Sequence, residues 1–453
     1  MNRTYYIQTL GCQMNYSDSE RIDAVLQNMG LSKVDKMSEA DLVIFNTCSV
    51  KQKAEDKVFG QMVNVDKLRK IKPHLIAGIT GCMVRNTSTK ESEERDKILK
   101  RSEHVDFVFR IEDLPQLPGI IMQLWPDIDM AETQEANLKN YFEINPVYTT
   151  KAQAFVPIGT GCDNFCTYCI VPYSRKREKS RPMNDIVKEC EKLVDNGCLE
   201  ITLLGQNVNS YGLSNLDKKT EEFKDVQTPF VHLLEKIDAL KSRGLKRLRF
   251  TSNHPKDLSD ELIDAMARLE TLMPYLHLPV QSGNDDVLKK MNRNYTADWY
   301  RDMIKKIRLA VPGIAISTDI IVGFCGETEE QFMDTCRLFE DVQWDMCYLS
   351  QYSTRIGTFA SQNMDDDITP EVKAERWRSL NELLKKYALK GHKVFEGKVV
   401  EALVEKCENG KCEGRSEHFK TVIFDSEKDL TGTLQKVQVE LGREWQLEGK
   451  LIQ

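Results

Sequence analysis

Three cysteines lie close together in the stretch CDNFCTYC. Cys162, Cys166 and Cys169 form the pattern C-x3-C-x2-C. Thiolates at this spacing can wrap around one iron–sulfur cluster, and three of them leave one iron of a four-iron cluster without a protein ligand. A structural zinc site has four protein ligands and no open position, so here it would need a remote cysteine or histidine as the fourth ligand. The pattern therefore favours a cluster with one open iron, where a small molecule can bind, and keeps zinc as the alternative.

A second set of three cysteines is spread over the first part of the chain. Each ends a predicted strand: residues 4–12, 40–48 and 74–82 end at Cys12, Cys48 and Cys82. In an open parallel sheet the carboxyl ends of the strands line the ligand crevice. We therefore expect these three thiols to converge at one edge of the sheet and to form a second site.

The elements that must position these cysteines follow from the apolar patterns. Up to about residue 140, short apolar strands alternate with polar helices, which predicts a doubly wound α/β domain over 1–140. Its first helix is expected over 17–30, with Ser17 or Asp18 as cap and Gly30 as stop. A polar segment over about 130–154 is expected to link this domain to the next one.

The rest of the chain divides into two further domains, so the fold class is α/β multidomain. Six strand-like runs separated by helices predict a partial (β/α)6 barrel over 148–380, with its chemistry at the strand carboxyl ends; the runs are residues 155–162, 200–207, 246–253, 275–283, 314–324 and 346–353. Over 385–453 short strands and an Asn409-Gly410 turn predict a small all-β barrel.

Composition limits the possible classes of protein. The 453 residues are 41% apolar and 29% charged, which is typical of a globular protein, and no window resembles a membrane helix or a signal peptide. We therefore expect a cytoplasmic protein, where free cysteines are ligands more often than disulfides. The net charge of −7 excludes a general nucleic-acid coat, so any contact with nucleic acid should come from a local patch.

One such patch directly follows the loop with three cysteines. Five basic residues there face a single acidic one, Glu178; they are Arg175, Lys176, Arg177, Lys179 and Arg181. A run of this kind is usually solvated, but beside a cluster loop it also suits RNA phosphates or the carboxylate of a cofactor. In the last domain Arg415 and Lys420, with Phe419 between them, are further candidates for RNA contact.

Beyond these patterns, the stretch CDNFCTYC resembles the signature of the radical S-adenosylmethionine (SAM) enzymes. The resemblance implies a partial (β/α)6 barrel and a [4Fe–4S] cluster whose open iron binds SAM. One electron from the cluster then cleaves SAM to a 5′-deoxyadenosyl radical. The stretches TLGCQMNYSDSE, NTCSV and GITGC are similar to the methylthiotransferases, in which Cys12, Cys48 and Cys82 would hold a second [4Fe–4S] cluster. The stretch GRSEHFKTVIF resembles the TRAM domain, an RNA-binding module.

The resemblance covers essentially the whole chain and implies a function. The stretch GCQMN is similar to the corresponding stretch in the tRNA branch of the family. That branch converts N6-isopentenyladenosine beside the anticodon to its 2-methylthio derivative. It implies as partners SAM, the anticodon loop of tRNA and an external electron donor such as flavodoxin or ferredoxin, and we expect a monomer. One departure is Lys176, which stands where glycine is common in the family.

Superfamily enzymes hold SAM at strand ends, which implies candidate contacts in the loops that follow the strands. The candidates are Gly205, Gln206, Asn207, Ser252, Gln281, Arg293 and Asp319. Gly323 and Gly326 could let the backbone pack near the adenine, and Arg293 could pair with the SAM carboxylate.

Other readings stay open at this point. A sibling enzyme would act on threonylcarbamoyl-adenosine in tRNA or on a ribosomal-protein aspartate. An electron-transfer protein with two clusters and an RNA-binding tail, or a non-catalytic RNA-binding protein with a structural metal, would belong to other classes. Among the remaining cysteines, Cys407 and Cys412 should face each other across the Asn409-Gly410 turn.

Overall fold

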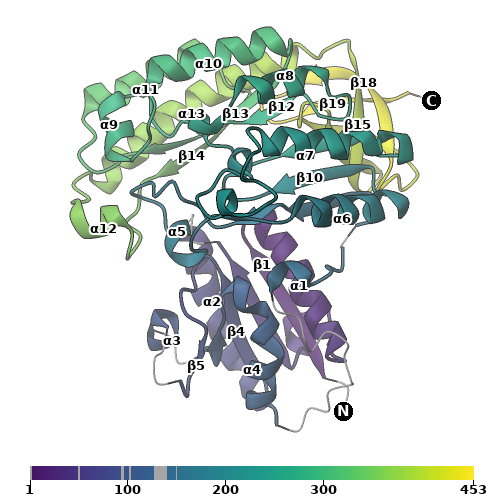
Figure 1. The fold of residues 1–453 in the computed structure, drawn as a ribbon, viewed down its shortest axis with the longest axis vertical. Helices are drawn as coiled ribbons and strands as arrows, with labels where there is room; N and C mark the ends of the chain where they lie inside the picture. The colour runs from purple at the N-terminus through teal and green to yellow at the C-terminus, as the bar shows by residue number, and fades with distance from the viewer. Residues whose placement is uncertain are drawn as a thin grey trace. The chain divides into compact units, whose positions relative to one another are not determined.

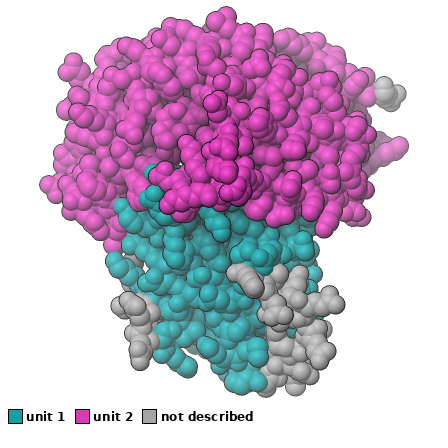
Figure 2. Space-filling view, viewed as in Figure 1, with its two compact units in different colours: residues 1–149, 160–163, 169–181 teal, residues 150–159, 164–168, 182–453 magenta. Residues whose placement is uncertain are grey.

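The computed structural model describes residues 3–48, 52–92, 96–101, 104–126, 140–148 and 150–452, without the side chains of 52–55, 100 and 101. The chain forms two compact units, coloured separately in Figure 2. Unit 1 comprises residues 1–149, 160–163 and 169–181, and unit 2 comprises residues 150–159, 164–168 and 182–453. Residues 130–139 and 149 of the expected linker lie outside the described residues. In the described parts of the chain, none of the helices combines the length and apolar character that a membrane crossing requires.

Unit 1 contains a six-stranded sheet in the order β2-β1-β3-β4-β6-β5 (Figure 1). The strands are β1 (Thr4–Leu10), β2 (Ser32–Lys33), β3 (Leu42–Thr47), β4 (Ile76–Gly81), β5 (Ser88–Thr89) and β6 (Phe107–Val108). All neighbouring pairs are parallel except β5 and β6. The parallel sheet predicted from the alternating pattern is confirmed.

Helices pack on both faces of this sheet. They are α1 (Gln13–Asn28), α2 (Gln52–Arg69), α3 (Lys97–Arg101) and α4 (Leu117–Leu124), with short 3-10 helices at Met37–Glu39, Ile111–Gln116 and Tyr141–Glu143. On β3, Leu42 and Ile44 join the core that α1 and α4 cover, whereas Val43 and Phe45 join the core on the side of α2 and α3. Successive strand residues point to opposite faces, so this split confirms the doubly wound arrangement.

Helix α1 begins earlier than the sequence pattern predicts. It starts at Gln13 with Cys12 as its N-cap residue, so the prediction of Ser17 or Asp18 as the cap is wrong. The Asn15 side chain accepts a hydrogen bond from the Cys12 N–H at 3.2 Å, which fixes the first turn there. Ser17 and Asp18 therefore lie inside the helix, where both are buried.

Unit 2 contains all six strands predicted for the partial barrel. They are β7 (Gln153–Pro157), β10 (Glu200–Leu204), β11 (Arg247–Phe250), β12 (Tyr275–His277), β13 (Ala315–Val322) and β14 (Met346–Gln351). They form two parallel three-stranded sheets, β11-β10-β7 and β12-β13-β14. A bridge between Leu248 and Leu272 continues the pairing from β11 toward the segment before β12.

Helices alternate with these strands along the chain (Figure 1). They are α6 (Met183–Asp195), α7 (Pro229–Asp238), α8 (Asp260–Arg268), α9 (Asp285–Lys290), α10 (Ala297–Ala310), α11 (Glu329–Val342), α12 (Phe359–Asn363) and α13 (Pro370–Lys393). Four 3-10 helices accompany them at Val208–Ser210, Asp217–Lys219, Ala239–Arg243 and Pro255–Asp257. The short elements β8 (Gly159–Thr160), α5 (Val171–Ser174) and β9 (Lys179–Ser180) flank the cysteine loop.

The end of the chain forms the predicted small barrel. Its strands are β15 (Val399–Glu408), β16 (Lys411–Ser416), β17 (Thr421–Asp425), β18 (Leu434–Gly442) and β19 (Leu447–Leu451), closed in the order β15-β16-β17-β19-β18. Cys407 and Cys412 lie opposite each other across the Asn409-Gly410 turn and are joined by a disulfide.

Two buried arginines of β11 connect this barrel to the rest of unit 2. Arg247 and Arg249 donate four hydrogen bonds of 2.6–2.9 Å, and the acceptors are the main-chain carbonyls of Glu401, Arg415, Ser416 and Glu417. Glu200 on β10 pairs with Arg249 at 3.0 Å and compensates its buried charge. These four bonds hold the barrel through its backbone.

Candidate functional site

The cysteines at the ends of β1, β3 and β4 meet at one edge of the sheet in unit 1. Cys48 N–H donates to the Leu10 carbonyl and Cys82 N–H to the Thr47 carbonyl, each at 3.0 Å, so both residues continue the strand pairing. The thiol of Cys48 forms a hydrogen bond with that of Cys12. We call Cys12, Cys48 and Cys82 the thiol triad.

Glycines precede two of these cysteines because no side chain fits there. At Gly81, where φ is +98°, a Cβ atom would lie 2.2 Å from the Thr47 carbonyl oxygen. At Gly11 a Cβ atom would lie 2.0 Å from the Asn15 amide oxygen. Each glycine lets its cysteine approach the neighbouring strand or helix closely. A glycine-cysteine pair at a strand end is thus a local sequence signal for this arrangement.

The thiols of the triad differ in their tendency to ionise. The hydrogen bond from Cys48 makes the largest contribution and lowers the pKa of Cys12 to about 6; the Asn15 backbone and the charge of Arg175 act in the same direction, whereas burial opposes them. Burial raises the pKa of Cys82, and Arg175 opposes this shift. A thiol at a helix N-terminus that ionises this readily suits binding of a soft metal as thiolate.

The donor set of the triad suits an iron–sulfur cluster, whose iron atoms are bound by cysteine thiolates. In a four-iron cluster each thiolate binds its own iron, so the ligands need not share one centre. Three convergent thiols on rigid strand ends therefore fit such a cluster, with one iron left open.

The basic run after the cysteine loop divides into exposed and buried residues. Lys176, Arg177 and Lys179 are exposed, as a contact with RNA phosphates requires. Arg175 and Arg181 are only 3% and 6% exposed, and Arg175 pairs with Asp18. The run is therefore not solvated as a whole, because two of its five basic side chains are buried.

Two basic residues of the C-terminal barrel were also predicted to contact RNA. Lys420 is buried and pairs with Asp345 at 2.5 Å, so its charge is already compensated inside unit 2. Arg415 is partly exposed, donates to Thr421 at 2.7 Å and lies over the Phe419 ring. Of the two, the structure leaves only Arg415 within reach of solvent.

The three cysteines of the C-x3-C-x2-C loop are placed by separate contacts. Cys162 follows Gly161, whose φ is +81° and whose missing Cβ would lie 2.2 Å from the Arg177 carbonyl oxygen. Cys162 and Cys169 are partly exposed residues of unit 1. Cys166 is buried in unit 2, where the Arg293 guanidinium donates to its sulfur at 3.6 Å.

Arg293 has three contacts around the cysteine loop and the strand ends. Besides Cys166, this buried guanidinium donates to the Pro279 carbonyl at 2.6 Å and to the Tyr295 hydroxyl at 2.7 Å. Each of its three nitrogens thus has one partner, and Nη1 places a donor on the Cys166 sulfur. The contact of Arg293 with a SAM carboxylate stays a prediction. Such N–H···S contacts are among the factors that set the reduction potential of iron–sulfur clusters.

Buried polar atoms collect after β10 and β11, at the strand ends where chemistry was expected. Gln206 Oε1, Asn207 Oδ1, Asn253 Oδ1 and His254 Nε2 find no hydrogen-bond partner among the described residues. Burial lowers the pKa of His254 to about 2, so its ring is neutral. Its Nδ1 accepts from the Lys256 N–H at 3.3 Å, which leaves the proton on Nε2.

These atoms identify two residues that sequence reasoning did not select, Asn253 and His254. Both directly follow β11, and this position at a strand end was the signal that could have found them. Leaving buried polar atoms unpaired costs about 1–3 kcal/mol each, so four of them together indicate a site shaped for a polar ligand.

Of the other predicted contacts of SAM, Ser252, Gln281 and Gly205 follow strands, whereas Asp319 lies within β13. Ser252 and Gln281 both adopt left-handed backbone, with φ of 67° and 76°. Strain of this kind is concentrated at functional sites. Asp319 on β13 is partly exposed and faces His277 Nε2 at 3.5 Å. Gly205 follows β10, where a Cβ would approach Val208 to 3.1 Å.

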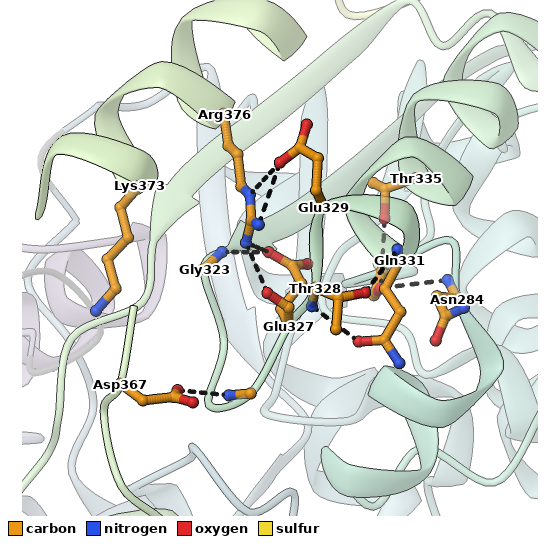
Figure 3. Close-up of polar contacts among 12 residues, drawn as sticks. Asn284, Gly323, Glu327, Thr328, Glu329, Gln331, Thr335, Asp367, Lys373 and Arg376 are labelled. Carbon is orange, nitrogen blue, oxygen red and sulfur yellow. Dashed lines mark hydrogen bonds and ion pairs between the residues drawn. The ribbon is translucent and has the colours of Figure 1, made fainter. Parts of the chain in front are cut away.

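The loop after β13 is held by a buried carboxylate (Figure 3). Glu327 accepts the N–H of Gly323 at 2.6 Å and pairs with Arg376 of α13 at 2.9 Å. Arg376 also reaches the exposed Glu329 at 3.2 Å. Burial raises the pKa of Glu327, and Arg376 opposes this shift. Gly323 and Gly326 have φ of 69° and 67°, so the loop depends on both glycines and on this clamp.

Replacing Arg376 with methionine should loosen this loop, because Glu327 would be left buried without its partner. Breaking a buried pair in this way costs about 3–5 kcal/mol. Hydrogen–deuterium exchange of peptides covering 320–332 measures the loss of protection. In the control, Glu329→Gln removes only the ion pair between Arg376 and the exposed Glu329, which is worth at most about 1 kcal/mol. Equal exchange in the two variants would contradict the role given to Glu327.

Comparisons with known proteins show which families the chain resembles. Residues 156–339 match the model of the radical SAM superfamily, and residues 4–110 match the uncharacterized protein family UPF0004. Among solved structures, the radical S-adenosylmethionine methyltransferase TsrM from Kitasatospora setae superposes with a TM-score of 0.54 at 14% identity, over 80% of this chain and 77% of that one. At this identity the likeness concerns the fold alone.

Curated relatives match over the full length of the chain. The tRNA-2-methylthio-N(6)-dimethylallyladenosine synthase of Thermoanaerobacter sp. (strain X514) is 41% identical over 100% of this chain and 93% of its own length. Proteins of the same name from Carboxydothermus hydrogenoformans and Clostridium perfringens (strain 13) are each 40% identical, over 99% and 98% of their lengths. The chain therefore belongs to the family of the tRNA-2-methylthio-N(6)-dimethylallyladenosine synthases.

Proposed function

We propose that this protein converts N6-isopentenyladenosine (dimethylallyladenosine) beside the anticodon of tRNA to its 2-methylthio derivative. It is a transferase of the radical SAM class and uses SAM and two [4Fe–4S] clusters. The observation that carries the proposal is the convergence of the thiol triad in a chain that also bears the C-x3-C-x2-C loop. The C-x3-C-x2-C loop alone would account for SAM cleavage only. The loop together with the thiol triad accounts for cleavage and for sulfur insertion.

The chemistry of the substrate requires this equipment. Adenine C2 carries no acidic proton, so general-base catalysis cannot prepare it for sulfur. When bound, SAM and the reduced cluster supply a carbon radical strong enough to activate the C2–H bond. We assign Cys162, Cys166 and Cys169 to that cluster and Cys12, Cys48 and Cys82 to the other.

The unpartnered atoms after β10 and β11 support SAM binding there. SAM carries an ammonium group, which needs acceptors, and Gln206, Asn207 and Asn253 each offer a buried carbonyl oxygen. It also carries a carboxylate, for which the neutral His254 offers the Nε2–H group. We therefore assign these four residues to the amino-acid end of SAM and leave Ser252, Gln281 and Asp319 as candidates for the rest.

For tRNA we propose contacts from the exposed basic residues. Lys176, Arg177 and Lys179 suit the phosphates of the anticodon loop, and Arg415 suits a contact from the TRAM-like barrel. An external electron donor, a monomeric state and a cytoplasmic location stay part of the proposal, supported by the family and the composition.

Mass spectrometry of nucleosides tests the function directly. Reconstituted enzyme is incubated anaerobically with SAM, dithionite and tRNA that carries N6-isopentenyladenosine. We expect the 2-methylthio nucleoside to appear together with 5′-deoxyadenosine. Matched tRNA with unmodified adenosine should give far less product. Product only with threonylcarbamoyl-adenosine or a ribosomal protein would point to a sibling enzyme, and absence of 5′-deoxyadenosine to an electron carrier.

A further inference from the structure

The last turns of α13 carry a row of lysines on one side of the helix. Lys386, Lys390 and Lys393 are exposed and follow one another at intervals of four and three residues. Side chains at this spacing are neighbours on a helix surface, so the row is about 10 Å long. Together with Leu389 and the exposed Val394, they line a shallow groove of about 450 Å³. We call the three lysines the lysine row.

The side chains of the lysine row contact neutral groups. Lys390 Nζ donates to Oε1 of Gln343 at 2.9 Å, and Lys386 Nζ lies 5.0 Å from the centre of the Tyr387 ring. None of the three lysines forms an ion pair with another residue in the described part of the chain. The positive charge of the row is therefore directed to solvent without a compensating carboxylate.

The carboxylates closest in sequence to the row have partners of their own. Glu382 pairs with Lys385 at 2.8 Å, and Glu396 accepts a main-chain N–H of the C-terminal barrel at 3.0 Å. His392 adds no charge, because burial lowers the pKa of its ring to about 4. Residues 385–398 thus contain five lysines and a single glutamate, in a chain whose net charge is −7.

The position of the row at a helix end explains it only in part. The C-terminus of a helix attracts cations, because its free carbonyl groups carry partial negative charge. This attraction applies to Lys390 and Lys393 in the last turn, whereas Lys386 lies one turn earlier. Like charges four residues apart on a helix also repel each other. The row therefore lowers the stability of its own helix in a way that an anionic partner would offset.

A groove lined by three uncompensated ammonium groups is complementary to a polyanion. Phosphate contacts hold a nucleic acid in register on a protein whatever its base sequence, and lysine binds phosphate as a point charge. We propose that the lysine row binds the phosphate backbone of the tRNA substrate, as a surface additional to Lys176, Arg177, Lys179 and Arg415. This inference rests on the proposed function, which supplies the identity of the RNA.

The salt dependence of tRNA binding tests the lysine row. Reconstituted holoenzyme is titrated into fluorescently labelled tRNA that carries N6-isopentenyladenosine, over a series of KCl concentrations, and binding is followed by anisotropy. The row variant combines Lys386→Gln, Lys390→Gln and Lys393→Gln. Each phosphate contact contributes about 0.7–0.9 to the slope of log K against log salt concentration, so the slope should fall by about 2–3. Affinity at low salt should fall about 3- to 100-fold, the range for three exposed ion pairs.

A control variant makes the same change of net charge elsewhere on unit 2. It replaces with glutamine three exposed lysines that already pair with carboxylates, namely Lys241 with Glu270, Lys305 with Asp302 and Lys306 with Asp260. Its slope and affinity should equal those of the wild type. An unchanged slope in the row variant, or an equal decrease in both variants, overturns the inference. Loss of binding to anionic phospholipid vesicles in the row variant, with its tRNA slope unchanged, would assign the surface to a membrane instead.

Further variants separate binding from folding. Arginine at the three positions of the row keeps the charges and should keep the slope, so a decrease as large as in the row variant would overturn the inference. If the row variant loses its iron or its helical circular dichroism, the three single glutamine variants are titrated instead. Each should lower the slope by about 0.7–0.9, and an unchanged slope in all three overturns the inference.

The outcome is distinguishable from failure of the proposed function. If the wild type forms the 2-methylthio nucleoside but the row variant binds tRNA with the wild-type slope, the inference fails and the function stands. If no methylthio product forms although tRNA binds with a slope that depends on the row, the function fails and the lysine row remains an RNA-binding surface.

Discussion

Cys162→Ala is expected to abolish the cleavage of SAM. The variant keeps only two thiolates of the C-x3-C-x2-C loop, and a four-iron cluster that already lacks a fourth protein ligand cannot spare a third. Iron content should fall from about eight to about four atoms per chain, because each cluster contains four. Formation of 5′-deoxyadenosine, measured with dithionite and SAM, should drop to the background without enzyme.

Cys336→Ala is the matched control for this variant. Cys336 lies on α11 and is 8% exposed, and burial raises the pKa of its thiol to about 11, so it is not disposed to bind metal as thiolate. This control should retain both clusters and SAM cleavage. Full iron content together with normal cleavage in Cys162→Ala would contradict the assignment of the loop.

Cys12→Ala is expected to separate the two halves of the reaction. It removes a ligand of the thiol triad but leaves the other cluster loop and the polar atoms after β10 and β11 intact. SAM cleavage should therefore largely persist, while the 2-methylthio nucleoside disappears. Both products are measured in one reaction, so a general loss of protein cannot imitate the result.

The division of labour between the two clusters depends on this separation. Loss of both products to the same degree, in a Cys12→Ala preparation with a normal circular dichroism spectrum and about four irons, would show that the triad also supports cleavage. The control Cys336→Ala should keep both products. If Cys12→Ala itself keeps both products, Cys12 is not one of the cluster ligands.

The arrangement of the strands was predictable because it follows from local patterns. Apolar runs ending in Cys12, Cys48 and Cys82 predicted both the parallel sheet and the meeting of the thiols, and β1, β3 and β4 confirm this. The start of α1 was not predictable in the same way. Cysteine is an uncommon cap residue and serine a common one, but here the cap is decided by Asn15 in the first turn of the helix.

Parts of the sites depend on distant contacts that no local pattern contains. Arg175 belongs to a basic run that resembles a solvated face, yet Asp18, more than 150 positions earlier, draws it into the interior. The contacts of Arg293 with Cys166, Pro279 and Tyr295 join residues 127, 14 and 2 positions apart, and the first of them is in no local pattern. Burial of a charge is a property of the folded neighbours and not of the residue's own sequence.

The attachment of the C-terminal barrel has a consequence for how such proteins diversify. Arg247 and Arg249 bind peptide carbonyls, and every residue type carries one. Any loop that follows the same backbone path satisfies them, whatever its side chains. These four bonds therefore do not fix the side chains at 401, 415 and 417, whereas Ser416 is buried and its hydroxyl accepts the Lys420 N–H, so it is more restricted. A barrel grafted from a distant relative would keep these bonds, but it would also have to supply the lysine that pairs with Asp345 and the ring that stacks on Tyr275, as Lys420 and Phe419 do here.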